Sequence, residues 1–261
     1  MTKLSQLIKL NQWLLCDMPQ YEDEAKTYSQ TEEEQWRLFR SLSNMREPAP
    51  ISGEFIKLQD SFLQEKISDR GIIKLSALPP MREELYLWQG DITTLQVDAI
   101  VNAANSELTG CYIPLHGCID NVIHTFAGVA LRLECAEIME KQGFPEPTGK
   151  AKITKAYNLP CKHILHTVGP IISDRLTQED CEKLASCYRS CLELADRKGL
   201  CSLAFCCIST GEFHFPNQEA AEIAVKTVED YKIETGSSIK VIFNVFKDED
   251  YFIYQRLLKI K

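Results

Sequence analysis

The stretch GCYIPLHGCIDN, residues 110–121, places two cysteines and a histidine within eight positions, directly before a segment of helical pattern. Thiolate and imidazole are ligands that Zn²⁺ prefers, and the glycines and proline here allow a loop in which Cys111, His116 and Cys118 converge. The C-x4-H-x-C spacing matches no common structural zinc finger. Three unrelated loop residues, or a reactive pair of thiols, therefore stay open as alternatives to a metal site.

The number of ligands decides what a zinc ion would do in this loop. A structural site closes with four protein ligands, whereas three ligands and an open position are typical of catalytic zinc. Asp120 and His124 follow, but both belong to the start of the expected helix, so the sequence favours an open site with one Zn²⁺ ion. Asp120 is a natural N-cap of that helix, and it is also suited to orienting water or acting as a general base.

Two further stretches place polar groups after expected strands. CISTGEFHFPN, residues 207–217, lacks lysine and arginine and precedes a helix, so its backbone N–H groups are suited to binding a phosphate or diphosphate. WQGDITTLQVDAIVNAAN, residues 88–105, ends a buried strand with Asn102 and Asn105. An ordinary strand-to-helix turn explains the first stretch equally well, and hydrogen bonding to loop backbone explains the two asparagines.

Composition excludes several classes of protein. The 261-residue chain has a net charge of -8, which argues against non-specific nucleic-acid binding because that binding needs Lys and Arg against the phosphates. Eleven cysteines without a secretion signal argue against a disulfide framework. No segment has the length and apolarity of a membrane span or of a signal peptide, so we expect a soluble, cytoplasmic protein.

The elements that must position these residues fall into two parts. Residues 1–80 are expected to form a helical N-terminal extension, because LSQLIKLNQWLL, TEEEQWRLFRSL and EFIKLQDSFLQEKI carry apolar residues at helical spacing. Residues 81–261 alternate short apolar runs, expected as strands at 84–91, 97–103, 151–159, 163–169, 202–209 and 238–246, with helical segments at 119–141, 177–198, 217–231 and 248–260. This order predicts an α/β fold of three layers, α/β/α, with a mixed, mostly parallel sheet and ligands at the carboxyl ends of its strands.

Taken in order and spacing, these stretches resemble the macrodomain family over residues 86–261. GDITTLQVDAIVNAAN is similar to the family's opening strand and ligand loop, CIDNVIHTFAG to its helix-starting segment, HILHTVGP to its central strand, and ISTGEFHFP to its diphosphate loop. Most macrodomains carry a glycine run before the helix, where this chain has GCYIPLHGC. That difference and the helical extension resemble the zinc-dependent microbial branch, which is often linked to a sirtuin-type ADP-ribosyltransferase and to lipoate-carrying proteins.

The resemblance implies that the ligand is ADP-ribose and assigns residues to each part of it. The adenine would be recognised by the carboxylate and the amide of the Gly-Asp turn and would pack against an aromatic ring after the last strand. The distal ribose would be contacted by an asparagine, and the loop after the fifth expected strand would enclose the diphosphate. In that order, the implied binding residues are Asp91, Ile92, Phe246, Asn105, Ser209, Thr210, Gly211, Glu212 and Phe213.

The resemblance also implies the chemistry at the distal ribose. Cys111, His116 and Cys118 would bind zinc beside that sugar, and Asp120 lies where many hydrolytic macrodomains have an acidic residue. The implied catalytic residues are Asn105, which would fix the sugar, and Asp120, which would assist as base. His214 departs from the wider family, which commonly has a glycine there.

The expected function is zinc-dependent removal of mono-ADP-ribose from modified protein side chains, with the metal polarising water or the scissile linkage. Two alternatives stay open, an ADP-ribose reader without turnover and an O-acyl-ADP-ribose deacylase. The zinc could also be purely structural and rigidify the loop. The expected partners are ADP-ribose and a mono-ADP-ribosylated protein, with a lipoate-carrying protein as one candidate, and neither nucleic acid nor membrane.

Overall fold

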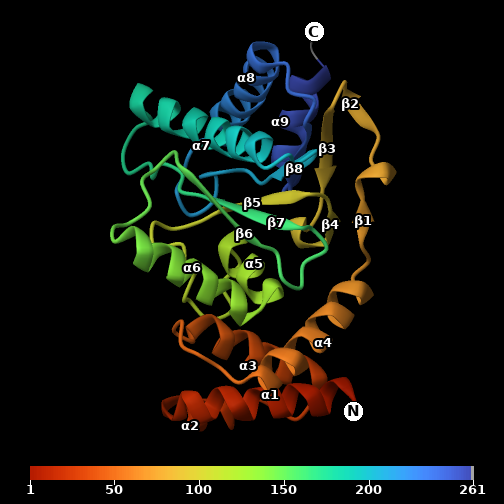
Figure 1. Cartoon of the computed structure of the whole chain (residues 1–261), viewed down its shortest axis with the longest axis vertical. Helices are drawn as coiled ribbons and strands as arrows, with labels where there is room; N and C mark the ends of the chain where they lie inside the picture. The colour runs from red at the N-terminus through yellow and green to blue at the C-terminus, as the bar shows by residue number, and fades with distance from the viewer. Residues whose placement is uncertain (260–261) are drawn as a thin grey trace.

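A computed structural model describes residues 1–259, in which helices cover both faces of a seven-stranded mixed sheet (Figure 1). The central strands run parallel, and the two edge strands, β2 and β6, pair antiparallel with their neighbours. In spatial order the strands are β2 (Pro80–Arg82), β3 (Leu85–Gln89), β9 (Lys240–Val245), β8 (Ser202–Phe205), β5 (Ala99–Ala103), β7 (His163–Thr167) and β6 (Ala151–Lys155). The predicted fold class is confirmed. Two short strands, β1 (Ile73–Lys74) and β4 (Leu95–Gln96), form a separate parallel pair that the sequence did not predict.

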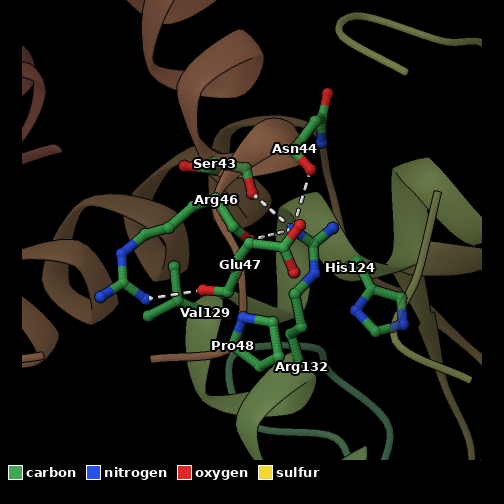
Figure 2. A pocket seen from close by; sticks show the side chains of 9 residues that line it. Ser43, Asn44, Arg46, Glu47, Pro48, His124, Val129 and Arg132 are labelled. Atoms are coloured by element: carbon green, nitrogen blue, oxygen red, sulfur yellow. Dashed lines mark hydrogen bonds between the residues drawn. The ribbon is translucent and has the colours of Figure 1, made fainter. Parts of the chain in front are cut away.

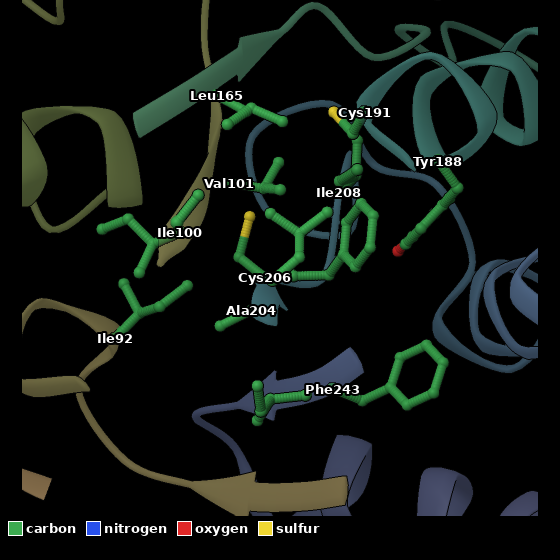
Figure 3. Close-up of a cluster of buried hydrophobic side chains, with 14 of the residues drawn as sticks. Ile92, Ile100, Val101, Leu165, Tyr188, Cys191, Ala204, Cys206, Ile208 and Phe243 are labelled. Atoms are coloured by element: carbon green, nitrogen blue, oxygen red, sulfur yellow. The ribbon is translucent and has the colours of Figure 1, made fainter. Parts of the chain in front are cut away.

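The central strands are buried because helices cover both of their faces. The four residues of β8 are all buried, as are the first four of β5, which explains why these segments read as continuous apolar runs. Figure 3 shows the core that they form, with the sulfurs of Cys191 and Cys206 among aliphatic side chains. These two cysteines act as small hydrophobic residues, as their apolar surroundings in the sequence predict.

Three helices pack on one face of the sheet and two on the other (Figure 1). The first group is α7 (Gln178–Arg197), α8 (Asn217–Thr235) and α9 (Asp248–Lys259), and the second is α5 (Ile119–Ala127) and α6 (Val129–Gln142). The predicted single helix over 119–141 is therefore wrong. It breaks at Gly128, whose φ of 91° favours glycine and where a Cβ would lie 2.5 Å from Nε2 of Gln59. Ile260, the last residue of the helix expected over 248–260, lies outside the described residues.

The N-terminal helices have an apolar core of their own. They are α1 (Lys3–Asp17), α2 (Glu22–Ala25), α3 (Glu32–Met45) and α4 (Gly53–Asp69). Helices α3 and α4 contact α5 at the side away from α7–α9, and α1 packs on α3 and α4 (Figure 1). Leu10, Phe39 and Phe62 belong to this core, which includes one residue of α6, Val129. Within residues 1–259 no helix is long and apolar enough to cross a membrane.

A buried arginine of α6 joins the N-terminal helices to the rest of the chain. Nη1 of Arg132 donates to the backbone carbonyls of Ser43 (3.2 Å), Asn44 (2.8 Å) and Arg46 (2.6 Å), where α3 ends (Figure 2). These groups line a cavity of only about 10 Å³ beside His124. The last carbonyls of a helix lack intrahelical partners and carry its negative dipole end, so a cation is well placed there.

We expect Arg132→Met to lower the free energy of unfolding by about 2–4 kcal/mol, because it leaves several buried carbonyls without a charged donor. Urea unfolding followed by circular dichroism measures this change. Arg189→Met is the matched control, since Arg189 pairs with Glu193 and Glu234 on the surface and should contribute less than about 1 kcal/mol. Equal losses in the two variants would show that Arg132 does not join the two parts.

Candidate functional site

The loops that follow four neighbouring parallel strands meet at one edge of the sheet. In spatial order these strands are β3, β9, β8 and β5, and they are followed by Asp91, Phe246, the loop 206–216 and Asn105 respectively. With strands about 4.8 Å apart, the four span roughly 14 Å, which suits an elongated ligand lying across the strand ends. The predicted adenine, diphosphate and ribose residues therefore follow one another along this edge in the order of the ligand's own parts.

At the first end of this edge, the carboxylate of Asp91 is held from two sides. Its Oδ1 accepts from the amide (2.9 Å) and the hydroxyl (2.6 Å) of Thr93, and its Oδ2 pairs with Arg70, just past the end of α4. The amide of Ile92 has no acceptor among the described residues, and Phe246 is 77% exposed. A donor and an aromatic face are thus both available to a planar ligand.

The loop 206–216 after β8 presents free backbone amides. Bonds from the Phe215 amide to the Ser209 carbonyl (2.9 Å) and from the His214 amide to the Gly211 carbonyl (3.0 Å) fold it on itself, and the Thr210 hydroxyl donates to the Cys207 carbonyl (3.1 Å). Among the described residues, the amides of Gly211, Glu212 and Phe213 have no acceptor. Successive free N–H groups before the N-terminus of α8 form the kind of concavity that binds phosphate.

The backbone of His214 explains why a glycine is common at this position. Its φ is 56°, in the left-handed region, and Ser209 in the same loop has φ 65°. A residue with a Cβ is strained there by roughly 1–2 kcal/mol, whereas glycine is not. His214 therefore keeps the loop shape that a glycine would have, at a cost in stability.

The predicted metal ligands converge in the loop between β5 and α5. Their ligand atoms, from Cys111, His116 and Cys118, all lie within 4.8 Å of one another, and Cys111 Sγ is 3.6 Å from His116 Nδ1. Tetrahedral zinc with ordinary bond lengths separates a sulfur and a nitrogen ligand by roughly 3.5 Å, so the spacing fits that ion. Burial raises the pKa of the Cys118 thiol to about 12, and the neighbouring Cys111 adds to this effect. A bound cation would reverse that balance by favouring the thiolate.

The other ring nitrogen of His116 faces the anion-binding loop. His116 Nε2 lies 3.5 Å from Oε1 of Glu212, so a carboxylate from the loop 206–216 reaches the histidine of the metal loop. Histidines that bind metals usually present their second nitrogen to a carboxylate or carbonyl, which fixes the tautomer and orients the ring. The two loops are therefore joined through His116 and Glu212.

A second group that could hold a metal ion lies deeper, and consists of His124, Cys135 and His166, all buried. The His166 ring is already engaged at both nitrogens: Nδ1 lies 3.1 Å from Asn102 Nδ2, and Nε2 lies 2.9 Å from the Thr154 hydroxyl. A metal ion here would have to displace one of these contacts, and all three of its ligands are buried. The more accessible Cys-His-Cys loop is the better candidate on both counts.

The predicted N-cap is wrong. Cys118 caps α5 by accepting from the Asn121 amide (3.4 Å), and Asp120 lies within the first turn, 5% exposed. Asn102 donates to Asp120 Oδ1 (2.8 Å), and burial raises the pKa of the Asp120 carboxyl to about 6 against the lowering effects of Asn102 and Arg132. A thiol is a rarer cap than a carboxylate, which is why the sequence pointed to the wrong residue.

The two asparagines hold the loop and the core beneath it. Asn105 Nδ2 donates to the Gly110 carbonyl (3.0 Å), directly before Cys111, and its Oδ1 accepts from the Glu107 amide (3.0 Å). Asn102 is fully buried against Asp120 and His166. The interpretation that Asn residues here satisfy loop backbone therefore applies to Asn105.

Sequence reasoning missed residues of α3 that contact the metal loop. Arg40 donates to the His116 carbonyl (2.5 Å), and Asn44 Oδ1 accepts from the Leu115 amide (3.1 Å). These partners lie more than 70 positions apart in the chain, and no local pattern marks either residue. Only the packing of α3 against α5 brings them together.

The buried His166 should make stability depend on pH. Burial lowers its pKa to about 3, whereas an unfolded histidine titrates near 6.5, so in between only the unfolded chain takes up this proton. As the pH decreases below about 6.5, the free energy of unfolding should decrease too. This residue contributes up to about 1.4 kcal/mol per pH unit. Asp120, whose pKa is raised, opposes this trend below about pH 6.

His166→Gln isolates this contribution, because Asp120 is present in both proteins. Urea unfolding at pH 6.0 and 4.5 should show a stability loss smaller in the variant by about 1–2 kcal/mol. Equal losses in the two proteins would mean that His166 takes up its proton in the folded state as readily as in the unfolded chain.

Comparison with known proteins agrees with this architecture. The pattern of the Macro domain family matches residues 101–224. The chain is 55% identical to a protein-ADP-ribose hydrolase of Treponema medium over 99% of this chain and 100% of that one, and 53% identical to a protein-ADP-ribose hydrolase of Staphylococcus aureus (85% and 84%). The Trypanosoma brucei macrodomain solved in complex with ADP-ribose superimposes with a TM-score of 0.65 at 31% identity, covering 84% of this chain and 94% of that one. The chain therefore belongs to the macrodomain family.

Proposed function

We propose that this protein is a protein-ADP-ribose hydrolase that releases mono-ADP-ribose from modified protein side chains. The observation that carries the proposal is the convergence of two thiols and an imidazole next to a loop of free backbone amides, with His116 and Glu212 joining the two. Relatives that match nearly the whole chain at more than half identity bear the name of this activity. A reader of ADP-ribose would need the amides but not an open set of metal ligands.

We propose Zn²⁺ as the metal and Cys111, His116 and Cys118 as its three ligands. The fit rests on the soft donor set, on the 3.6 Å between sulfur and nitrogen, and on the carboxylate that faces the second nitrogen of His116. With three protein ligands the bound ion would supply a Lewis acid with one open position for water or for the sugar.

The other predicted residues are proposed to bind and orient the ligand. The Ile92 amide, Asp91 and Phe246 would hold the adenine. Residues 209–213 would enclose the diphosphate and bind it through the free amides of Gly211, Glu212 and Phe213, so that an acidic protein needs no lysine or arginine in that loop. Asn105 would position the distal ribose and the loop together, since its side chain lies beside the carbonyl before Cys111. Asp120 is proposed to assist as base, because a carboxylate whose pKa is about 6 is deprotonated yet more basic than usual at neutral pH.

The substrate is proposed to be a protein carrying mono-ADP-ribose, and a lipoate-carrying protein remains one candidate. We also propose that residues 1–80 are an extension that serves a macrodomain spanning residues 81–261. The N-terminal helices have their own apolar core, and the chain enters the large sheet at Pro80, which supports this division.

Removing the metal should abolish release of ADP-ribose from an ADP-ribosylated protein while free ADP-ribose still binds, and zinc should restore release. The reason is that the amide loop and the adenine site hold most of the ligand without the metal. Release is measured by chromatography and binding by calorimetry on the same samples. Cys111→Ser should behave like the metal-free protein, and Cys16→Ser, an exposed cysteine of α1, should behave like wild type.

Other outcomes of this experiment separate the alternatives. No release with or without zinc, but intact binding, would sink the hydrolase proposal for that linkage and favour a reader. Release only from O-acyl-ADP-ribose would point to a deacylase. Release that does not change when zinc is removed would make the metal structural or incidental.

Gly169→Ala should weaken binding of free ADP-ribose by about tenfold or more, since a displaced loop loses well-aligned hydrogen bonds to phosphate. A Cβ at Gly169 would lie 2.0 Å from Ser209 Oγ and 2.9 Å from Ile208 Cγ2, so these side chains, or the loop after β8 that carries them, must shift. Gly53→Ala is the control, because a Cβ there meets nothing within 4 Å. Wild-type affinity in the folded Gly169→Ala protein would argue that this loop does not bind the ligand.

A further inference from the structure

The metal loop, residues 110–118, has little regular backbone structure to hold it. It lies between β5 and α5, and it contains two residues in the left-handed region, Gly110 (φ 86°) and Leu115 (φ 58°). The His116 amide reaches the Ile113 carbonyl at 3.3 Å, the loop's one internal backbone bond among the described residues. Three ligand atoms within 4.8 Å of one another therefore need support from outside the loop.

Helix α3 provides that support at two positions about one helical turn apart. Nη2 of Arg40 donates to the His116 carbonyl (2.5 Å), and Oδ1 of Asn44 accepts from the Leu115 amide (3.1 Å). Arg40 and Asn44 lie four residues apart, so both face the loop from the same side of α3. Asn44 is 1% exposed, which means that its bonds have no competition from solvent.

A third side chain extends these contacts to the rest of the loop. The same Nη2 of Arg40 donates to Oδ1 of Asn121 (2.9 Å), and Asn121 Nδ2 donates in turn to the carbonyls of Ile113 (2.9 Å) and, more weakly, Cys111 (3.5 Å). Asn121 is fully buried. Arg40 thus orients the amide that binds the first half of the loop, while it binds the second half directly.

The charge of Arg40 suits the ligands as well as its geometry does. The guanidinium of Arg40 lies close enough to Cys118 for the two side chains to interact electrostatically. A nearby cation stabilises a thiolate, and thiolate is the form of cysteine that binds a metal.

We propose that α3 is a working part of the metal site, in which Arg40 and Asn44 are positioning residues that hold loop 110–118 with its ligands converged. This inference rests on the proposed metal site and deepens it. It gives the N-terminal helices a role inside the enzyme, as opposed to a surface for the modified protein. Supporting residues behind metal ligands typically change metal affinity or activity by about 10–100-fold, which sets the expected size of the effect.

The test uses the full-length chain with three substitutions on α3. Arg40→Gln removes the charge and the forked donor, Arg40→Lys keeps the charge, and Arg37→Gln changes an exposed arginine of the same helix that faces Glu34. Two quantities are measured, the affinity for zinc by competition with a chromogenic chelator, and hydrogen exchange of the amides of residues 110–118 in metal-free protein. Circular dichroism verifies that each variant is folded.

We expect Arg40→Gln to weaken zinc binding by about 10–100-fold and to speed exchange in the loop, most clearly at Leu115 and His116. Arg40→Lys should lie between Arg40→Gln and wild type, and Arg37→Gln should equal wild type. Folded Arg40→Gln with wild-type zinc affinity and wild-type loop exchange would overturn the inference. If Arg40→Gln does not fold, Arg40→Lys decides in the same way, since wild-type values there would overturn it.

Release of ADP-ribose by the wild-type protein is measured separately. A wild-type protein that binds zinc but releases no ADP-ribose would contradict the proposed function, and the zinc and exchange data would still decide on Arg40. A wild-type protein that binds no zinc would overturn the metal site and this inference together.

Discussion

Loop 110–118 has to hold two thiols and an imidazole close together without a ladder of backbone hydrogen bonds to fix its shape. Side chains around the loop supply the hydrogen bonds that its own backbone lacks. Asn105 binds the carbonyl before Cys111, Cys118 caps α5 with its sulfur, and Asn121 reaches back to the loop from the first turn of α5. Helix α3 binds it from the other side. The loop is shaped by side chains from three directions, and the elements that carry those side chains must be rigid for the ligands to converge.

The same protein must bind an anion although its net charge is -8. Backbone amides solve this problem because they attract phosphate without adding fixed positive charge to the loop, and the N-terminus of α8 adds its dipole. Even Glu212, within that loop, need not repel the ligand, since its carboxylate points to the imidazole of His116 at 3.5 Å. A diphosphate bound by the amides would therefore lie next to the metal loop. Glu212 would link the two, because its backbone belongs to the anion-binding loop and its side chain contacts His116.

Periodicity and turn chemistry predicted the sheet, its carboxyl-end site and the Cys-His-Cys loop, because each of these depends on residues that are close in sequence. Prediction failed where a distant residue decided the outcome. The helix over 119–141 breaks at Gly128, where the Gln59 side chain packs closely and accepts from the Val129 amide. Nothing near Arg40 or Asn44 indicates that they bind a loop 71–76 residues further along the chain. The cap of α5 was missed for a different reason, since thiols are seldom considered as caps.

The separation between α3 and the metal loop has a consequence for how the chain is made. Helices α1–α4 leave the ribosome before the loop exists, and all the buried residues of their apolar core except Val129 belong to these first residues, so most of that core can form before the loop is made. The carbonyls at the end of α3 receive their donor only when Arg132 has been made. The Leu115 amide of the loop, by contrast, can bind Asn44 as soon as the loop is made, because α3 already exists. The three ligands are therefore made when the helix that holds their loop is already present. This shortens the time during which the thiols of the new chain are unprotected against oxidation or against binding the wrong metal.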